Sequence, residues 1–212
     1  STATAEAFNA NITWDGGGAD ANWSTVANWS TNTVPTSADV AVFDGTCSSN
    51  CSPTINAAIN VLGISMNAGY AGTITQALGS SITVAIGSSG WTLAAGTFTG
   101  NNANITITDG SFNQSGGSFT APNATTSIER NFTVSAGTFC ATTGTFSFVD
   151  SNSTDDSTLT CTGVTFNLVV FTKDSNGEVT ISSGCTVPLG ASPTTYLSEA
   201  LTNNGTITIA SG

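Results

Sequence analysis

The chain has almost no positive charge. Arg130 and Lys173 are its two basic residues, 13 residues are Asp or Glu, and there is no histidine. The net charge of −11 repels phosphate backbones and anionic headgroups, which excludes nucleic acid and anionic membrane surfaces as partners. Without histidine, a Ser-His-Asp triad is excluded as well. Charged residues make up only 7% of the chain, against roughly 25% in an average soluble domain.

Long apolar runs and helical periodicity are also missing. No stretch approaches the 18 or so apolar residues of a membrane span, so we expect no membrane insertion. No window shows sustained 3.6-residue apolar spacing, because Gly, Thr and Ser interrupt every stretch. The glycine run of WDGGGA is not followed by Lys-Ser/Thr, which argues against a nucleotide loop. The chain starts at Ser1 without a methionine or an apolar signal core, and this predicts a processed chain located extracellularly or at the cell surface.

Five cysteines support that location. Cys47 and Cys51 lie four residues apart in the turn-rich TCSSNCSP, where a small loop can close. We expect the disulfides Cys47–Cys51 and Cys140–Cys161, with Cys185 as the odd thiol, although sequence alone does not fix connectivity.

Ten Asn-X-Ser/Thr sequons accompany the cysteines. A chain rich in Asn, Ser and Thr also forms sequons by chance, so their glycosylation stays an open alternative. The candidate acceptors are Asn11, Asn22, Asn28, Asn50, Asn104, Asn113, Asn123, Asn131, Asn152 and Asn204.

What the sequence does contain is a series of short strand patterns in which apolar residues alternate with Thr or Ser. They are INVLGIS (59–65), SITVAIG (81–87), NITIT (104–108), NFTVS (131–135), STLTC (157–161), GEVTIS (177–182) and GTITIA (205–210). The aligned apolar positions are Ile82, Ile105, Phe132, Leu159, Val179 and Ile207, and Gly-Thr/Ser-Phe recurs at 96–98, 110–112, 117–119, 137–139 and 144–146.

A repeat of about 20 to 28 residues with glycine corners has the length of one β-solenoid coil. We therefore predict an all-β, right-handed parallel β-helix with interior Phe and Ile ladders. The alternative is an antiparallel β-sandwich. We divide the chain into an extension (1–12), an N-terminal aromatic cap with the first strands (13–56) and solenoid coils (57–212).

The segment TWDGGGADANWSTVANWSTNTVPTSADVAVFDG carries a resemblance to known proteins. It is similar to the opening of bacterial secreted and surface β-solenoid proteins (an autotransporter-like or large exoprotein-like repeat family), which continue into Gly-Thr-Phe coils. The matching residues are Trp14, Gly16, Gly17, Asn22, Trp23, Asn28, Trp29, Pro35, Asp39, Val40 and Phe43. The resemblance implies an extracellular scaffold, stalk, adhesin or assembly subunit, and it brings no catalytic residues.

Catalysis finds little support in the residues. A glycoside hydrolase needs two carboxylates across the scissile bond, and the candidates are Asp155 with Asp156, or Asp109, Glu129 and Asp150 from successive coils. A polysaccharide lyase needs a basic residue beside carboxylates, which leaves Arg130 and Lys173. We expect no enzyme and no cofactor, and treat a structural calcium ion at Asp15 and Asp20 as a minor alternative.

The tryptophans and threonines offer two further alternatives. Trp23 and Trp29 are candidates for stacking on surface glycans, against a role in closing the end of the solenoid. Thr-X-Thr occurs at 73–75, 97–99, 106–108, 158–160, 160–162 and 206–208. Such arrays match ice in some antifreeze proteins, but here they recur at no fixed spacing, so we attribute them to strand alternation.

The two ends of the chain suggest self-assembly. Residues 1–12 form an extended, weakly apolar segment that could add as a strand to a neighbouring copy, and GTITIASG offers a receiving edge. We predict a head-to-tail homopolymer, a filament or surface layer, with a monomeric adhesin as the alternative. The expected assembly residues are Ala3, Ala5, Ala7, Phe8, Ile207 and Ile209.

Overall fold

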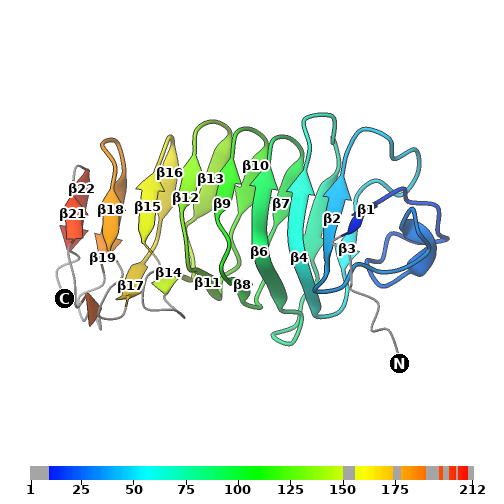
Figure 1. Cartoon of the computed structure of the whole chain (residues 1–212), viewed down its shortest axis with the longest axis horizontal. Helices are drawn as coiled ribbons and strands as arrows, with labels where there is room; N and C mark the ends of the chain where they lie inside the picture. The colour runs from blue at the N-terminus through cyan, green and yellow to red at the C-terminus, as the bar shows by residue number, and fades with distance from the viewer. Residues whose placement is uncertain are drawn as a thin grey trace, which may run out of the picture.

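A computed structural model of the chain describes residues 10–149, 156–173, 178–189, 196–197, 201–203 and 205–209. In these residues the regular structure is β-strand, apart from one 3-10 turn at Val26–Asn28. All pairings between the strands are parallel. The prediction of an all-β parallel solenoid is therefore confirmed, and the antiparallel sandwich is wrong (Figure 1).

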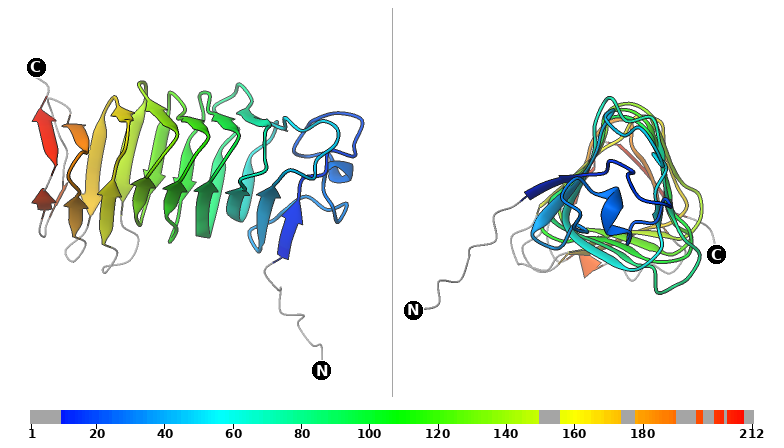
Figure 2. Two further views of the ribbon diagram at one scale, coloured as in Figure 1. Left: turned by 90° about the horizontal axis from the view of Figure 1, so that it is seen from above. Right: turned by 90° about the vertical axis from the view of Figure 1, so that its right-hand side faces the viewer.

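The coils stack into a prism of triangular cross-section, seen end-on in Figure 2. The first face holds β8 (Ile105–Ile107), β11 (Thr125–Ile128), β14 (Thr145–Val149), β17 (Val169–Lys173) and β20 (Tyr196–Leu197). The second face holds β9 (Phe112–Gln114), β12 (Phe132–Val134), β15 (Ser157–Thr160), β18 (Val179–Ile181) and β21 (Leu201–Asn203). The third face is a separate six-stranded sheet of β3 (Thr54–Ile55), β5 (Thr73–Gln76), β7 (Thr97–Thr99), β10 (Ser118–Thr120), β13 (Thr138–Ala141) and β16 (Val164–Phe166).

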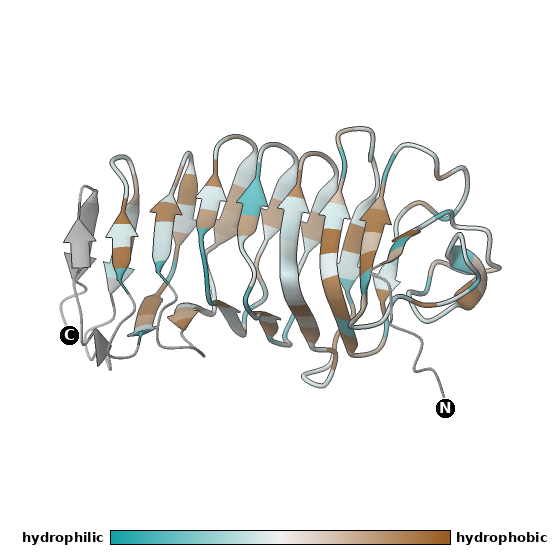
Figure 3. Ribbon diagram, viewed as in Figure 1, coloured by the Kyte–Doolittle hydropathy of each residue, from teal (hydrophilic) through white to brown (hydrophobic). Residues whose placement is uncertain are grey.

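The remaining strands connect these faces. β4 (Ile59–Met66) and β6 (Val84–Leu93) are long enough to run across both the first and second faces, and β1 (Ala10–Thr13) and β2 (Asp39–Phe43) precede them in the same sheet. At the other end, β19 (Thr186–Leu189) pairs with β17 and with β22 (Thr206–Ile209). Alternation of apolar and polar residues along the strands is visible in Figure 3.

The register corrects our alignment of repeats. Ile105 lies on the first face, where it pairs with Val84 and Thr126, whereas Phe132 lies on the second face and pairs with Phe112 and Leu159. The aligned positions therefore belong to different faces, because each coil contains several strands with the same alternation. The irregular repeat length comes from corners of variable size between strands that remain in register.

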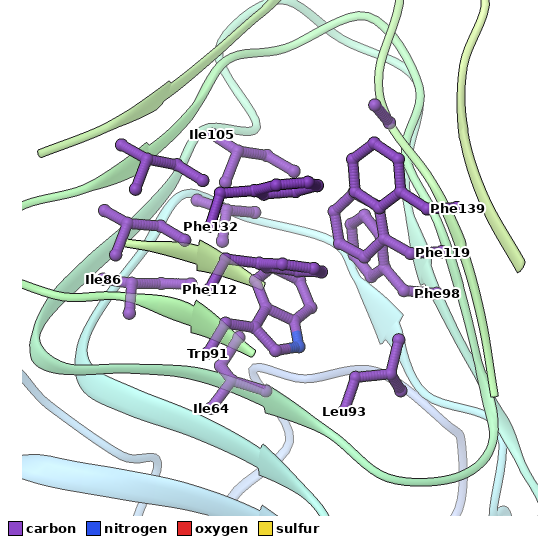
Figure 4. Packing of buried hydrophobic residues seen from close by; sticks show 14 of the residues in the cluster. Ile64, Ile86, Trp91, Leu93, Phe98, Ile105, Phe112, Phe119, Phe132 and Phe139 are labelled. Carbon is purple, nitrogen blue, oxygen red and sulfur yellow. The ribbon is translucent and has the colours of Figure 1, made fainter. Parts of the chain in front are cut away.

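Ladders of stacked rings fill the interior, as predicted (Figure 4). On the third face the ring centroids of Phe98 and Phe119 are 4.9 Å apart and those of Phe119 and Phe139 are 5.2 Å apart. From the second face, Phe112 stacks on Phe132 at 5.4 Å. These side chains are at most 2% exposed, and each Å² of apolar surface removed from water stabilises the fold by about 25 cal/mol.

Glycines make the corner before the third face. In the Gly-Thr/Ser-Phe motifs at 96–98, 117–119 and 137–139, the glycine has a φ of 79°, 61° and 90°, respectively, a backbone conformation that glycine adopts without steric penalty. A Cβ on Gly117 would lie 2.5 Å from the carbonyl oxygen of Gly96, one coil away. The recurring motif is thus a tight corner followed by a buried phenylalanine.

Candidate functional site

Three tryptophans close the N-terminal end of the solenoid. Trp14, Trp23 and Trp29 are at most 1% exposed, and their rings surround Phe43 of β2 at centroid distances of 5.7 to 6.2 Å. The Trp14 indole N–H donates to the carbonyl of Asn50 (3.0 Å), and that of Trp29 donates to the carbonyl of Trp23 (2.8 Å). The predicted aromatic cap is therefore present.

The same burial excludes Trp23 and Trp29 as glycan-stacking residues in this structure. Trp23 is 1% exposed and Trp29 is 0% exposed, so neither ring offers a face to a sugar. The sequence alone does not distinguish the two roles, because a tryptophan offers the same large apolar ring to a ligand and to a core.

In the glycine run of the cap, the backbone passes very close to the backbone at Ser49. Gly16 has a φ of 67°, and a Cβ added to it would collide with the carbonyl oxygen of Ser49. Asn28, which is fully buried, then holds the loop. Its amide donates to the carbonyls of Asp20 and Asn22 at 3.0 Å each, and its Oδ1 accepts from the N–H of Gly18 at 2.8 Å.

The disulfide prediction is half right. Cys47–Cys51 is formed, but the second bond is Cys161–Cys185, with Cα atoms 5.0 Å apart. Cys140 is the free cysteine among the described residues, so the predicted pair Cys140–Cys161 is wrong. Cys140 lies in β13 on the third face, whereas Cys161 and Cys185 follow β15 and β18 at equivalent corners of adjacent coils. Corner position decides the pairing, and order along the chain does not show it.

The described sequon asparagines fall into three groups, while Asn152 and Asn204 lie outside the described residues. Asn28 is buried and hydrogen-bonded, so its side chain is inaccessible to glycosylation in the folded protein. Asn22 and Asn50 are half-buried and donate hydrogen bonds within the cap. The exposed asparagines are Asn11, Asn104, Asn113, Asn123 and Asn131.

The acids of the cap are already used by its turns. One carboxylate oxygen of Asp15 accepts from the N–H of Gly17 at 2.9 Å. Asp20 accepts from the Thr25 hydroxyl at 2.7 Å and from the backbone and side chain of Asn22. The Thr25 hydroxyl and the Asn22 N–H are the main causes that lower the pKa of Asp20. Among the described residues no group of three metal-ligating side chains comes together.

The cap also borders a small pocket of about 250 Å³ on the side of the disulfide Cys47–Cys51. Tyr70 is buried there and donates its hydroxyl to the carbonyl of Cys51 at 2.8 Å, and burial raises the pKa of Tyr70 above its ordinary value. Asp44 supplies the pocket's carboxylate, which accepts from the N–H and hydroxyl of Thr46.

A charged cluster lies at the corner between the first and second faces, where the sequence predicted Asp109 and Glu129 to come together but did not predict that Arg130 and Lys173 join them. Arg130 donates from Nε to the carbonyl of Asp109 (2.9 Å) and forms a salt bridge with its carboxylate (3.2 Å). Oε2 of Glu129, a residue 4% exposed, accepts from the Asp109 N–H at 2.7 Å. Lys173 is 1% exposed and donates to the Glu129 carbonyl at 2.6 Å, which also accepts from the Ser157 hydroxyl.

This corner brings both basic residues of the chain together with two of the acids considered for catalysis, Asp109 and Glu129. Asp156 lies at the edge of the described residues and accepts from the Glu178 N–H at 3.0 Å, while Asp150 and Asp155 lie outside them. Several of these hydrogen bonds join a side chain to a backbone atom of a neighbouring coil, an arrangement that satisfies buried polar groups where the chain turns. The signal in the sequence was the placement of Glu129-Arg130 one coil after Asp109.

The expected assembly residues are only partly described. Ala3, Ala5, Ala7 and Phe8 lie outside the described residues, and Ala10–Thr13 form β1, which pairs with β2 of the same chain. Ile207 and Ile209 lie in β22, in register with Val187 and Leu189 of β19. In the described part of the chain, β21 and β22 stand at the two ends of the larger sheet's path, each paired on one side.

Comparison of the chain with protein-family models, with curated proteins and with solved structures found no match. A search of the described residues for a helix that is long and apolar enough to cross a membrane also found none. The two disulfides are compatible with a secreted protein. The solenoid fold is consistent with a structural or adhesin-like role.

Proposed function

We propose that the protein is an extracellular structural subunit that assembles head to tail into a filament or surface layer, without catalysis or a cofactor. The observation that carries this proposal is the one-sided pairing of β21 and β22 at the C-terminal end of the described solenoid. A strand edge presents unpaired backbone N–H and C=O groups, which are a template for a strand from another chain.

The segment before β1 supplies a donor of suitable chemistry. STATAEAFN alternates small apolar residues with polar ones, the pattern of a strand with one half-buried face. Because β1 belongs to the chain's own sheet from Ala10 onward, the donated segment consists of residues 1–9. Donation from the N-terminal end of one copy to the C-terminal end of the next is a heterologous contact, which propagates without closing.

The first experiment measures whether the full chain assembles into polymers. Sedimentation and negative-stain electron microscopy over a concentration series are expected to show polymers that lengthen with concentration. The double variant Ala5→Pro/Ala7→Pro should abolish them, since proline cannot donate to a strand ladder, and Ala5→Ser/Ala7→Ser is the matched control that keeps both N–H groups. A synthetic peptide of residues 1–9 should shorten the polymers by occupying the receiving edge.

Two results would contradict this proposal. Monomers at every concentration would favour the monomeric adhesin, which a glycan array would then test. Polymers that form equally well with both double variants would show that assembly does not use the N-terminal segment as a strand.

A further inference from the structure

The third face carries two columns of small polar side chains, all of them hydroxyls except the thiol of Cys140. Strand register places Thr54, Thr75, Thr99, Thr120, Cys140 and Thr165 in one column, with one residue from each strand of the sheet. The other column, two residues earlier along the strands, contains Thr73, Thr97, Ser118 and Thr138. Between the columns the intervening side chains point inward and are buried, among them Ile74, Phe98, Phe119 and Phe139, so the threonines face outward.

This register changes the meaning of the Thr-X-Thr motifs. The motifs at 73–75 and 97–99 are in register with Ser118-Phe-Thr120 and Thr138-Phe-Cys140, although their spacing in the sequence is uneven. The corners absorb the difference in coil length. Strand alternation alone is therefore an insufficient explanation for this face, because alternation does not require a hydroxyl at nearly every aligned position of successive coils.

The array is regular in two directions and rests on a rigid base. Adjacent strands are about 4.8 Å apart and alternate residues along a strand about 6.6 Å apart. Below the surface, the rings of Phe119 and Phe139 are stacked at 5.2 Å with an interplanar angle of 2°. Close-packed ladders of this kind leave little room for the outer side chains to shift.

The hydroxyl groups of these columns are left unpaired by the protein. In the described structure, none of the threonine or serine hydroxyls in the two columns makes a hydrogen bond to another protein group. The second face differs, since the hydroxyl of Thr92 donates to that of Ser65 at 3.0 Å and those of Thr160 and Ser182 lie 3.4 Å apart. Its corresponding column also includes an amide, Asn113.

Charge and aromatic side chains are missing from the surface of the third face. Its six strands, TI, TITQ, TFT, SFT, TFCA and VTF, contain no Asp, Glu, Lys or Arg. Charged groups would impose their own hydration shells. The phenylalanines are buried, so the face has no ring to stack on a sugar, which argues against a crystalline polysaccharide as its ligand.

We propose that the third face binds ice. Rows of hydroxyls at fixed spacing hold water molecules in fixed positions through hydrogen bonds, while the neighbouring threonine methyl groups favour ordered water around them. The repeat of about 4.8 Å between strands lies near a repeat of water oxygens on the surface planes of ice. The bound water can therefore continue the lattice of a growing crystal, and the face adsorbs to it.

The test is partition of the full-length protein between slowly grown polycrystalline ice and the remaining liquid, followed by tryptophan absorbance. Wild-type protein is expected to be retained in the ice, and Thr120→Lys to fall to the level of a non-binding protein. Asn113→Lys is the matched control, since it adds the same charge at an exposed position of the same coil on the second face. Thr99→Val/Thr120→Val removes two hydroxyls while it keeps the side-chain shape, and it should weaken retention. Circular dichroism verifies the fold of each variant.

Exclusion of the wild-type protein from ice would overturn the proposal, as would equal retention of Thr120→Lys and Asn113→Lys. Unchanged retention of the double valine variant would show that the hydroxyls are not used. Co-sedimentation with crystalline cellulose or chitin, without ice retention, would assign the face to a polysaccharide and also refute the proposal. Polymerisation changes how strongly all variants are retained but not which face is needed, so comparison of variants in the same assembly state separates this proposal from the assembly proposal.

Discussion

Removing the ring of Phe119 is the sharpest test of how this solenoid is held together. The side chain is 0% exposed, and its ring lies within 4.9 to 5.2 Å of four other rings, those of Trp91, Phe98, Phe112 and Phe139. Phe119→Ala removes this central ring from the ladder in Figure 4. Large-to-small changes of this type cost about 3–5 kcal/mol, since the cavity collapses only partly.

Phe119→Leu separates volume from ring stacking. Leucine fills much of the space but makes no aromatic pair, so we expect a smaller loss, about 1–2 kcal/mol. Leu78→Ala is the control, because Leu78 is 78% exposed and a surface change of this kind stays within about 0.5 kcal/mol. Urea unfolding followed by circular dichroism measures all three variants.

The region of the chain that loses amide protection in Phe119→Ala is as informative as the size of the loss in unfolding free energy. Each coil of a solenoid contacts only its neighbours, so Phe119→Ala should lower amide protection from hydrogen exchange first in β7, β10 and β13. The cap around Trp14 should stay protected. A change in unfolding free energy below about 1 kcal/mol for Phe119→Ala, or equal loss of protection along the whole chain, would refute the ladder as the main source of stability.

Other predictions follow from the disulfides, the charged corner and the cap. Alkylation of the native, non-reduced protein should label Cys140 alone, and labelling of a second cysteine would contradict the disulfide assignment. Cys161→Ser/Cys185→Ser should lower the unfolding free energy by about 3 kcal/mol, given the length of the loop that this disulfide closes. Lys173→Met should cost about 1–3 kcal/mol in urea unfolding, because the Glu129 carbonyl loses a buried donor; an unchanged midpoint would contradict this. Folding lowers the pKa of Asp20, so the contribution of this carboxylate to stability is present above the ordinary pKa of 3.8 and is lost as the pH falls through the lower, folded pKa. Asp20→Asn should remove that part of the pH dependence of unfolding, followed by tryptophan fluorescence. Identical acid titrations of the variant and the wild type would refute this prediction.

The fold was predictable because it depends on local patterns that repeat. Alternation of Ile or Phe with Thr specifies a strand with one buried face, and Gly-Thr/Ser-Phe marks a corner before a buried ring. What the alternation does not specify is which of three faces a strand joins. Ile105 and Phe132 look equivalent in the sequence but lie on different faces.

The sites were less predictable because they depend on stacking between coils. Cys161 bonds Cys185 rather than Cys140 since the first two share a corner. Arg130 and Lys173 meet at one corner although 43 positions separate them. Corner loops of variable length hide such relations from any search for fixed spacing, and only the register of the strands reveals them.

The solenoid also separates the two activities proposed for it. The proposed assembly uses the ends of the larger sheet, whereas the proposed ice adsorption uses the outer surface of the separate third-face sheet. Distant sites in a chain of nearest-neighbour contacts act additively. Thr120→Lys should therefore leave polymer length unchanged, and Ala5→Pro/Ala7→Pro should leave the ice affinity of each subunit unchanged. Polymerisation nevertheless aligns many third faces, so retention in ice per subunit should rise with polymer length through multivalency. If the proline variant is retained in ice as strongly as the polymer under identical conditions, the faces do not act together.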